Sequence, residues 1–178
     1  HNESALTLSL HSFHHGGIWW GASQLLTSKL TSSLIDYLFD PLPWVRRLSS
    51  CVRTGCGIEG EHFVTVFMRD SPEKRNERGK LARFEDYVKH VKDGSTVLWQ
   101  TSNPELLKRA ADFSEQHQIR SCYTENNRSV NDAWGGRDPS KIAEMAVVGV
   151  VNKELSRGSD YIVSPSSSAW TWFIAGAN

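Results

Sequence analysis

"HFVTVFMR" (residues 62–69) is the stretch that decides the fold class of this chain. It is an almost continuous apolar run, rich in β-branched and aromatic residues, which is typical of a strand buried on both faces. Such strands belong to parallel sheets that are covered by helices on both sides. The run therefore predicts an α/β fold if helices and further strands follow it along the chain.

Helical patterns follow this run at regular intervals. Apolar residues recur at helical spacing over 80–94, and Gly94 marks the end of that expected helix. A second helix is expected over 103–117, because Asn103 is a good N-cap and Pro104 suits the first helical position.

Three further strands are expected over 96–100, 119–124 and 160–164, and a third helix from Asp138 to about Arg157. This alternation predicts right-handed βαβ units, which together form a Rossmann-like parallel sheet flanked by helices.

Residues 1–58 have a different pattern, which predicts two or three helices, the last restarting at Pro43. We therefore divide the chain into a helical N-terminal lead-in, 1–58, and a Rossmann-like domain, 59–178, whose ligand is inferred below to be a nucleotide sugar.

The composition of the 178 residues excludes several classes of protein. Lys+Arg and Asp+Glu both number 20, so the net charge is zero and argues against a general nucleic-acid binder. No apolar run reaches the length of a membrane span. The chain begins at His1 without a signal peptide, so we expect a processed product or a fragment.

The three cysteines are too few for a disulfide scaffold. Cys51 and Cys56 could close a small loop, which would leave Cys122 without a partner.

Ligands of open parallel sheets bind beyond the carboxyl ends of the strands. Arg69 follows the first expected strand there, and an arginine can bind phosphate oxygens in a bidentate manner. Ser167 and Ser168 follow the last strand and precede an expected helix, whose free N–H groups attract anions. These residues predict a phosphate or pyrophosphate site. The alternative is that the serines only cap a helix.

Other common sites lack their motifs. There is no GxGxxG, no GxxxxGK[ST] and no carboxylate pair in a strand-end loop to hold a metal–diphosphate. "HSFHH" (11–15) has no matching Cys, Asp or Glu, so a polar loop is favoured over a metal site. The pattern fits a metal-independent nucleotide-sugar site, in which arginine and the helix dipole replace the cation.

Five segments, in this order, resemble those of the α-1,6-fucosyltransferases, a GT-B family related to O-fucosyltransferases and nodulation fucosyltransferases. They are "WWGASQLLTSKLTSSLIDYLFDPLPWV" (19–45), "VFMRD" (66–70), "FEDYVKHV" (84–91), "LWQTSNPELLKRA" (98–110) and "LSRGSDYIVSPSSSAW" (155–170). The resemblance implies two Rossmann-like halves, of which this chain is the C-terminal, donor-binding half. The missing N-terminal half is then an expected partner, and we expect the isolated chain to transfer little sugar.

The resemblance also implies a function. The enzyme would transfer a sugar, with inversion, from a nucleotide-sugar donor such as GDP-fucose to a glycan or protein hydroxyl. It would need no metal or other cofactor, and it would work in the Golgi or secretory-pathway lumen of a eukaryote.

Roles for individual residues follow from the same resemblance. Arg69, Ser167 and Ser168 match the positions that hold the diphosphate. Glu77 has the family's spacing for the general base and Lys74 is the nearest lysine, both near the acceptor hydroxyl.

The chain also departs from the family. Phe67 replaces a histidine and Asp70 replaces a second arginine. No aspartate stands in register with the family's guanine-reading aspartate; Asn152 and Glu154 are the nearest polar residues, and Asn152 is taken as the candidate nucleotide-binding residue there. Asp70 and the missing histidine favour an alternative, a non-catalytic nucleotide- or glycan-binding module with the same fold. A third hypothesis, an unrelated doubly wound hydrolase, lacks a GxSxG nucleophile motif.

Overall fold

The computed structural model of the chain describes residues 8–9, 40–69, 82–125 and 139–165. In this part of the chain five strands form one sheet, in the order β1-β5-β2-β3-β4, and every neighbouring pair is parallel. The strands are β1 (Leu8–Ser9), β2 (Val64–Phe67), β3 (Thr96–Gln100), β4 (Arg120–Cys122) and β5 (Tyr161–Ser164). The predicted parallel sheet of an α/β fold is therefore confirmed.

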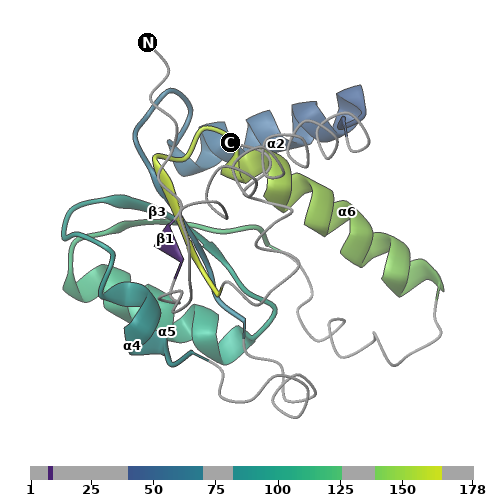
Figure 1. Ribbon diagram of the computed structural model, residues 1–178. Coiled ribbons are helices and arrows are strands. Elements are labelled where there is room, and N and C mark those ends of the chain that lie inside the picture. Colours follow the sequence, from purple (N-terminus) through teal and green to yellow (C-terminus); the bar gives the residue numbers. More distant parts are fainter. Residues whose placement is uncertain (1–7, 10–39, 70–81, 126–138, 166–178) are drawn as a thin grey trace, which may run out of the picture.

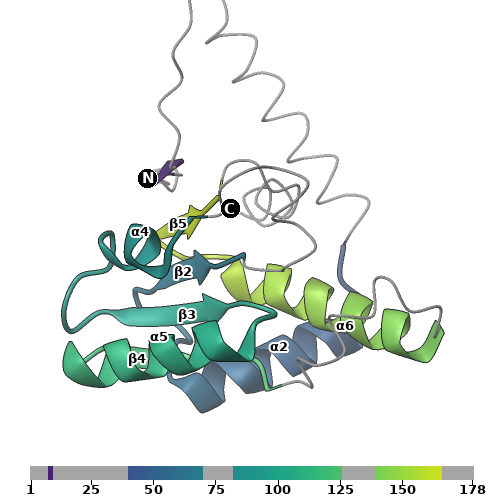
Figure 2. The ribbon, with the colours of Figure 1, turned by 90° about the horizontal axis from the view of Figure 1, so that it is seen from below.

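Helices cover both faces of this sheet (Figures 1 and 2). The helices are α2 (Pro43–Cys56), α4 (Phe84–Val88), α5 (Pro104–Gln116) and α6 (Pro139–Ser156). Helices α4 and α5 lie on one face, and α2 lies beside α6 on the other (Figure 1). None of the helices that the structure describes is both long and apolar enough to cross a bilayer.

Side chains alternate between two buried clusters along the strands, as the pleat requires. On β3, Val97 and Trp99 pack with residues of α4 and α5, whereas Leu98 between them packs with Val151 and Leu155 of α6. Burial on both faces explains why the central strands read as continuous apolar runs.

Several elements are shorter than the sequence predicts. The helix expected over 80–94 is wrong in its extent, because α4 ends at Val88. The Lys89 N–H still donates four residues back, to Glu85, but the N–H groups of His90 and Val91 donate three residues back, to Tyr87 and Val88, so the chain turns there. Strand β2 ends at Phe67, although the Met68 N–H still donates to the carbonyl oxygen of Gln100 at 2.8 Å.

The order of the strands creates a reversal in the direction of the chain. From β2 the chain passes through α4 to β3 and through α5 to β4, moving outward on one side of β2. Helix α6 then returns it across the sheet to β5, which pairs with the other side of β2. The topological switch point therefore lies between β2 and β5.

A disulfide bond between Cys56 and Cys122 joins the end of α2 to β4. The loop between Cys51 and Cys56 that the sequence allowed is therefore wrong, and Cys51 is an exposed free thiol. Residues five apart in an α-helix lie about 140° apart around its axis, so Cys51 and Cys56 point in different directions.

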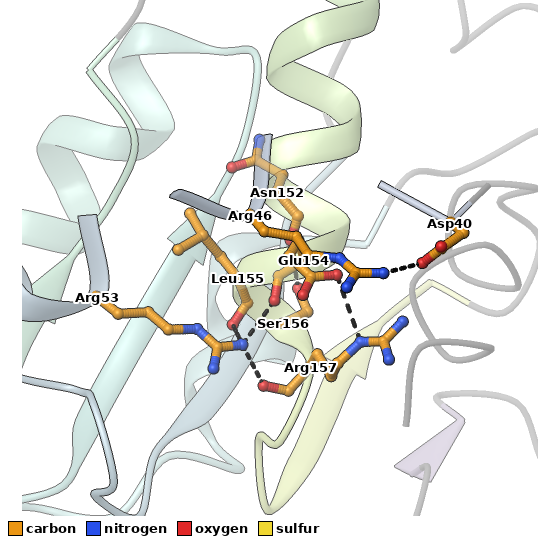
Figure 3. A network of polar contacts seen from close by, with 8 residues as sticks. All are labelled: Asp40, Arg46, Arg53, Asn152, Glu154, Leu155, Ser156 and Arg157. Carbon is orange, nitrogen blue, oxygen red and sulfur yellow. Dashed lines mark hydrogen bonds and ion pairs between the residues drawn. The ribbon is translucent and has the colours of Figure 1, made fainter. Parts of the chain in front are cut away.

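Arg53 makes a second connection between α2 and the rest of the molecule (Figure 3). Its guanidinium donates to the carbonyl oxygens of Glu154 at 2.6 Å, Leu155 at 3.3 Å and Arg157 at 2.5 Å. Carbonyl groups at a helix C-terminus have no partner within the helix, and a cation there is favoured by the helix dipole. Arg53 thus caps α6 from the neighbouring helix.

Loss of the disulfide should destabilise the fold. The bridged residues are 66 apart in sequence, and closing a loop of that length is worth about 4 kcal/mol. We expect the Cys56→Ser/Cys122→Ser protein to unfold at lower denaturant concentration, and Cys51→Ser to behave like the wild type. Thiol titration under denaturing conditions checks the pairing, with one reactive thiol per chain before reduction and three after it. Equal stability of the double variant and the wild type would contradict this assignment.

Loss of the Arg53 cap should also destabilise the fold. We expect Arg53→Ala to lower the free energy of unfolding by about 2–3 kcal/mol, because three part-buried carbonyl oxygens lose hydrogen bonds from a charged group. Arg47→Ala, at an exposed position of the same helix, is the control and should change little. Urea unfolding of the three proteins measures the difference, and equal losses in both variants would refute the capping role.

Candidate functional site

The candidate site lies at the carboxyl edge of the sheet, at the switch point. Strands β2 and β5 are direct neighbours there, with Val66 paired to Val163. Arg69 leaves the end of β2, and Pro165 leaves the end of β5. The structure thus brings together two strand ends that are far apart in sequence, and both had been predicted to border the ligand.

The backbone that carries Arg69 is held in place on one side by β3 and on the other by α4. The Met68 N–H donates to Gln100 of β3, and the Arg69 N–H lies 3.4 Å from the hydroxyl oxygen of Tyr87. Tyr87 is buried, with 1% of its surface exposed. Arg69 itself is half-buried, and within the described residues its guanidinium has no carboxylate partner. The backbone of Arg69 is therefore fixed at the carboxyl edge of the sheet.

A polar network connects the ends of β3 and β4 to α6. The Gln100 Nε2 group donates to the Asn152 carbonyl oxygen and to Ser156 Oγ, both at 2.8 Å. Ser156 Oγ also donates to the Asn152 carbonyl oxygen at 2.8 Å. The Thr124 hydroxyl donates to Asn152 Oδ1 at 3.0 Å, so the side-chain oxygen of Asn152 is already paired. The network fixes Asn152, which Figure 3 shows on α6 beside Ser156.

Two of the predicted site residues, Arg69 and Asn152, are therefore described, and Gln100 connects them. Its carbonyl oxygen holds Met68, next to Arg69, and its side chain holds Asn152. The other predicted site residues, Ser167, Ser168, Lys74 and Glu77, lie outside the described residues.

Sequence reasoning missed Gln100, Thr124 and Ser156. A signal was present for Gln100, which is a polar residue at the end of the apolar run "TVLW" (96–99), where the strand meets the ligand edge. The sequence gives no such signal for Thr124 and Ser156, because their role depends on hydrogen bonds to Asn152 that only the folded chain brings about.

The amino-terminal edge of the sheet carries a contact of a different kind. His62 Nδ1 lies 2.9 Å from a carboxylate oxygen of Asp160, and this contact raises the pKa of the imidazole. The His62 side chain is 96% exposed, so the pair is a surface contact. His62 and Asp160 precede β2 and β5, so the pair lies at the end of these strands opposite to the candidate site.

No cluster of three or more His, Cys, Asp or Glu that could hold a metal ion is found in the part of the chain that the structure describes. The "HSFHH" stretch (11–15) lies outside that part.

No known protein-family model and no curated protein sequence matches this chain. The fold defines it as an α/β protein with a parallel sheet flanked by helices, an arrangement compatible with a Rossmann-like domain.

Proposed function

We propose that this chain is the donor-binding part of a GT-B glycosyltransferase of the fucosyltransferase type. It takes a nucleotide sugar, with GDP-fucose as the donor, and serves transfer of the sugar to a hydroxyl group of a glycan or protein. The observation that supports this proposal best is the position of Arg69 at the switch point. In open α/β sheets, ligands bind in the crevice at that point.

The chemistry of the leaving group explains why an arginine suits this place. Negative charge develops on the diphosphate as the bond to the sugar breaks, and a guanidinium stabilises that charge without a metal ion. The stabilisation is greater in the transition state than in the ground state, which is what accelerates the reaction. Ser167 and Ser168 would contribute hydroxyl and backbone donors from the segment after β5.

We assign proton transfer to residues in the segment that follows β2 in the sequence. Glu77 would accept the proton of the acceptor hydroxyl as that oxygen attacks the anomeric carbon, while the diphosphate leaves from the opposite face. Lys74 in the same segment would lie near the acceptor hydroxyl. Inversion of the anomeric centre follows from this single displacement.

The disulfide bond supports a compartment for this reaction. Structural disulfides persist in oxidising compartments and are rare in the cytosol. The Cys56–Cys122 bond joins two elements of the core, so its formation would accompany folding. We therefore place the protein in the lumen of the Golgi or the secretory pathway.

A second candidate function is a non-catalytic module that binds a nucleotide or a glycan. The residues that favour it are Phe67, which cannot hydrogen-bond to a ligand, and Asp70, which adds negative charge beside a diphosphate site. A thermal-shift screen with GDP, UDP, ADP and CMP, with and without magnesium, tests nucleotide binding for both candidates. Donor-dependent glycosylation by an active preparation then separates them.

Replacement of Arg69 should weaken nucleotide binding. We expect Arg69→Ala to lose about 2–4 kcal/mol of binding free energy for GDP, because a desolvated diphosphate loses its charged partner. Arg69→Lys should recover only part of this, since the bidentate fork is lost. Isothermal titration measures the affinities. Arg120→Ala, at the amino end of β4, is the control. Wild-type affinity in Arg69→Ala would remove Arg69 from the site.

Replacement of Glu77 should lower turnover. In an active preparation of full-length protein, we expect Glu77→Gln to reduce kcat by about 10²–10⁴-fold with little change in donor affinity, the range for losing a general base. Glu73→Gln, four residues earlier in the same segment, should have a much smaller effect. Steady-state kinetics and donor titration of both variants decide the matter. Undiminished turnover in Glu77→Gln would make the non-catalytic module the better proposal.

A further inference from the structure

Buried polar atoms without partners gather on the α6-facing side of the sheet. Among the described residues, Thr65 Oγ1, Gln100 Oε1 and Ser164 Oγ are buried and have no hydrogen-bond partner. Their side chains alternate with Val66, Trp99 and Val163, which pack on the opposite side with α4 and α5. The three atoms therefore belong to the central strands β2, β3 and β5 and lie on one face.

Gln100 is the member of this group whose orientation is fixed. Its Nε2 group donates to the Asn152 carbonyl oxygen, which can only accept, so the amide cannot be turned around without losing this bond. Oε1 must therefore be the atom that stays without a donor. The residue is 3% exposed, so bulk water does not compensate.

An acceptor in this state has an energetic cost. A buried polar atom without a partner destabilises the folded protein, and native structures contain few of them. Such groups are tolerated where function needs them. Gln100 stands at such a place, because its own carbonyl oxygen accepts from the Met68 N–H at 2.8 Å, one residue before Arg69.

We infer that Gln100 is a further ligand-binding residue, whose Oε1 accepts a hydrogen bond from the nucleoside part of the donor. This inference rests on the proposed function. The group that donates is a ribose hydroxyl or the exocyclic amine of the base, which share the same chemistry toward a carboxamide oxygen. Because the site is buried, this hydrogen bond would distinguish ligands that carry the donor group from ligands that lack it. A ligand without the donor leaves Oε1 unpaired and out of contact with water.

Replacement of Gln100 tests this inference. Gln100→Met keeps a similar length without the carboxamide, and we expect it to weaken GDP binding by about tenfold or more in isothermal titration. Ser114→Ala is the control, because it also removes a buried polar contact but lies on the α5 side, where Ser114 accepts from Trp99. Thermal unfolding without ligand shows that each variant is folded. GDP affinity of Gln100→Met equal to that of the wild type would overturn the inference.

A second titration series identifies the donor and guards against an indirect effect. 2′-Deoxy-GDP and 3′-deoxy-GDP each lack one ribose hydroxyl, and inosine diphosphate lacks the exocyclic amine. For the analogue that lacks the group bound by Gln100, the wild type and Gln100→Met should bind with about equal affinity. A ratio of the two affinities that stays the same for all three would mean that Gln100 contacts neither group, and would overturn the inference.

The same measurements separate this inference from the proposed function. If the wild type binds no nucleotide, both fail. If Arg69→Ala loses GDP binding while Gln100→Met keeps it, the proposed function stands and only the role of Gln100 fails.

Discussion

The parallel pairing of β2 with β5 is the constraint on which the rest of the structure depends. The register of Val64 with Tyr161 and of Val66 with Val163 places the last described strand beside the first long one. Because crossovers between parallel strands are right-handed, a chain that reverses direction must place α6 on the face opposite α4 and α5. The two-sided covering of the sheet, the apolar character of β2 and the location of the switch point all follow from this pairing.

On the face of the sheet that carries α2 and α6, two specific contacts hold α2 in place. Helix α2 precedes β2 in the chain, so the strand–helix alternation does not determine where it lies. The disulfide to β4 and the contact of the Arg53 guanidinium with the end of α6 determine it, and both start from the last turn of α2. One is a covalent link, and the other satisfies carbonyl groups that every helix C-terminus leaves unpaired.

The carboxyl edge of the sheet combines hydrogen-bonded backbone with buried side-chain atoms that have no partner. Met68 and Gln100 hold the backbone beside Arg69, and Asn152 is held by Gln100 and Thr124. A site preorganised in this way does not have to order its own groups when a ligand binds. Two of the buried polar atoms without a partner in the described part of the chain, Gln100 Oε1 and Ser164 Oγ, belong to residues at the carboxyl ends of β3 and β5.

The sequence by itself determined the parallel α/β architecture, because buried strands and amphipathic helices are local patterns of apolar residues. The cap at Asn103 and Pro104 correctly placed the start of α5, and the left-handed Gly158 follows the end of α6 as expected. Arg69 could be proposed as a site residue because strand ends can be read from the sequence.

Only the tertiary structure decided the partner of Cys122, the early end of α4 and the roles of Gln100, Thr124 and Arg53. Each of these depends on a contact with a residue on another element, or on how the chain turns to reach the next strand. Periodicity carries no information about such contacts, because it records which face of an element is buried and not which residue lies against it.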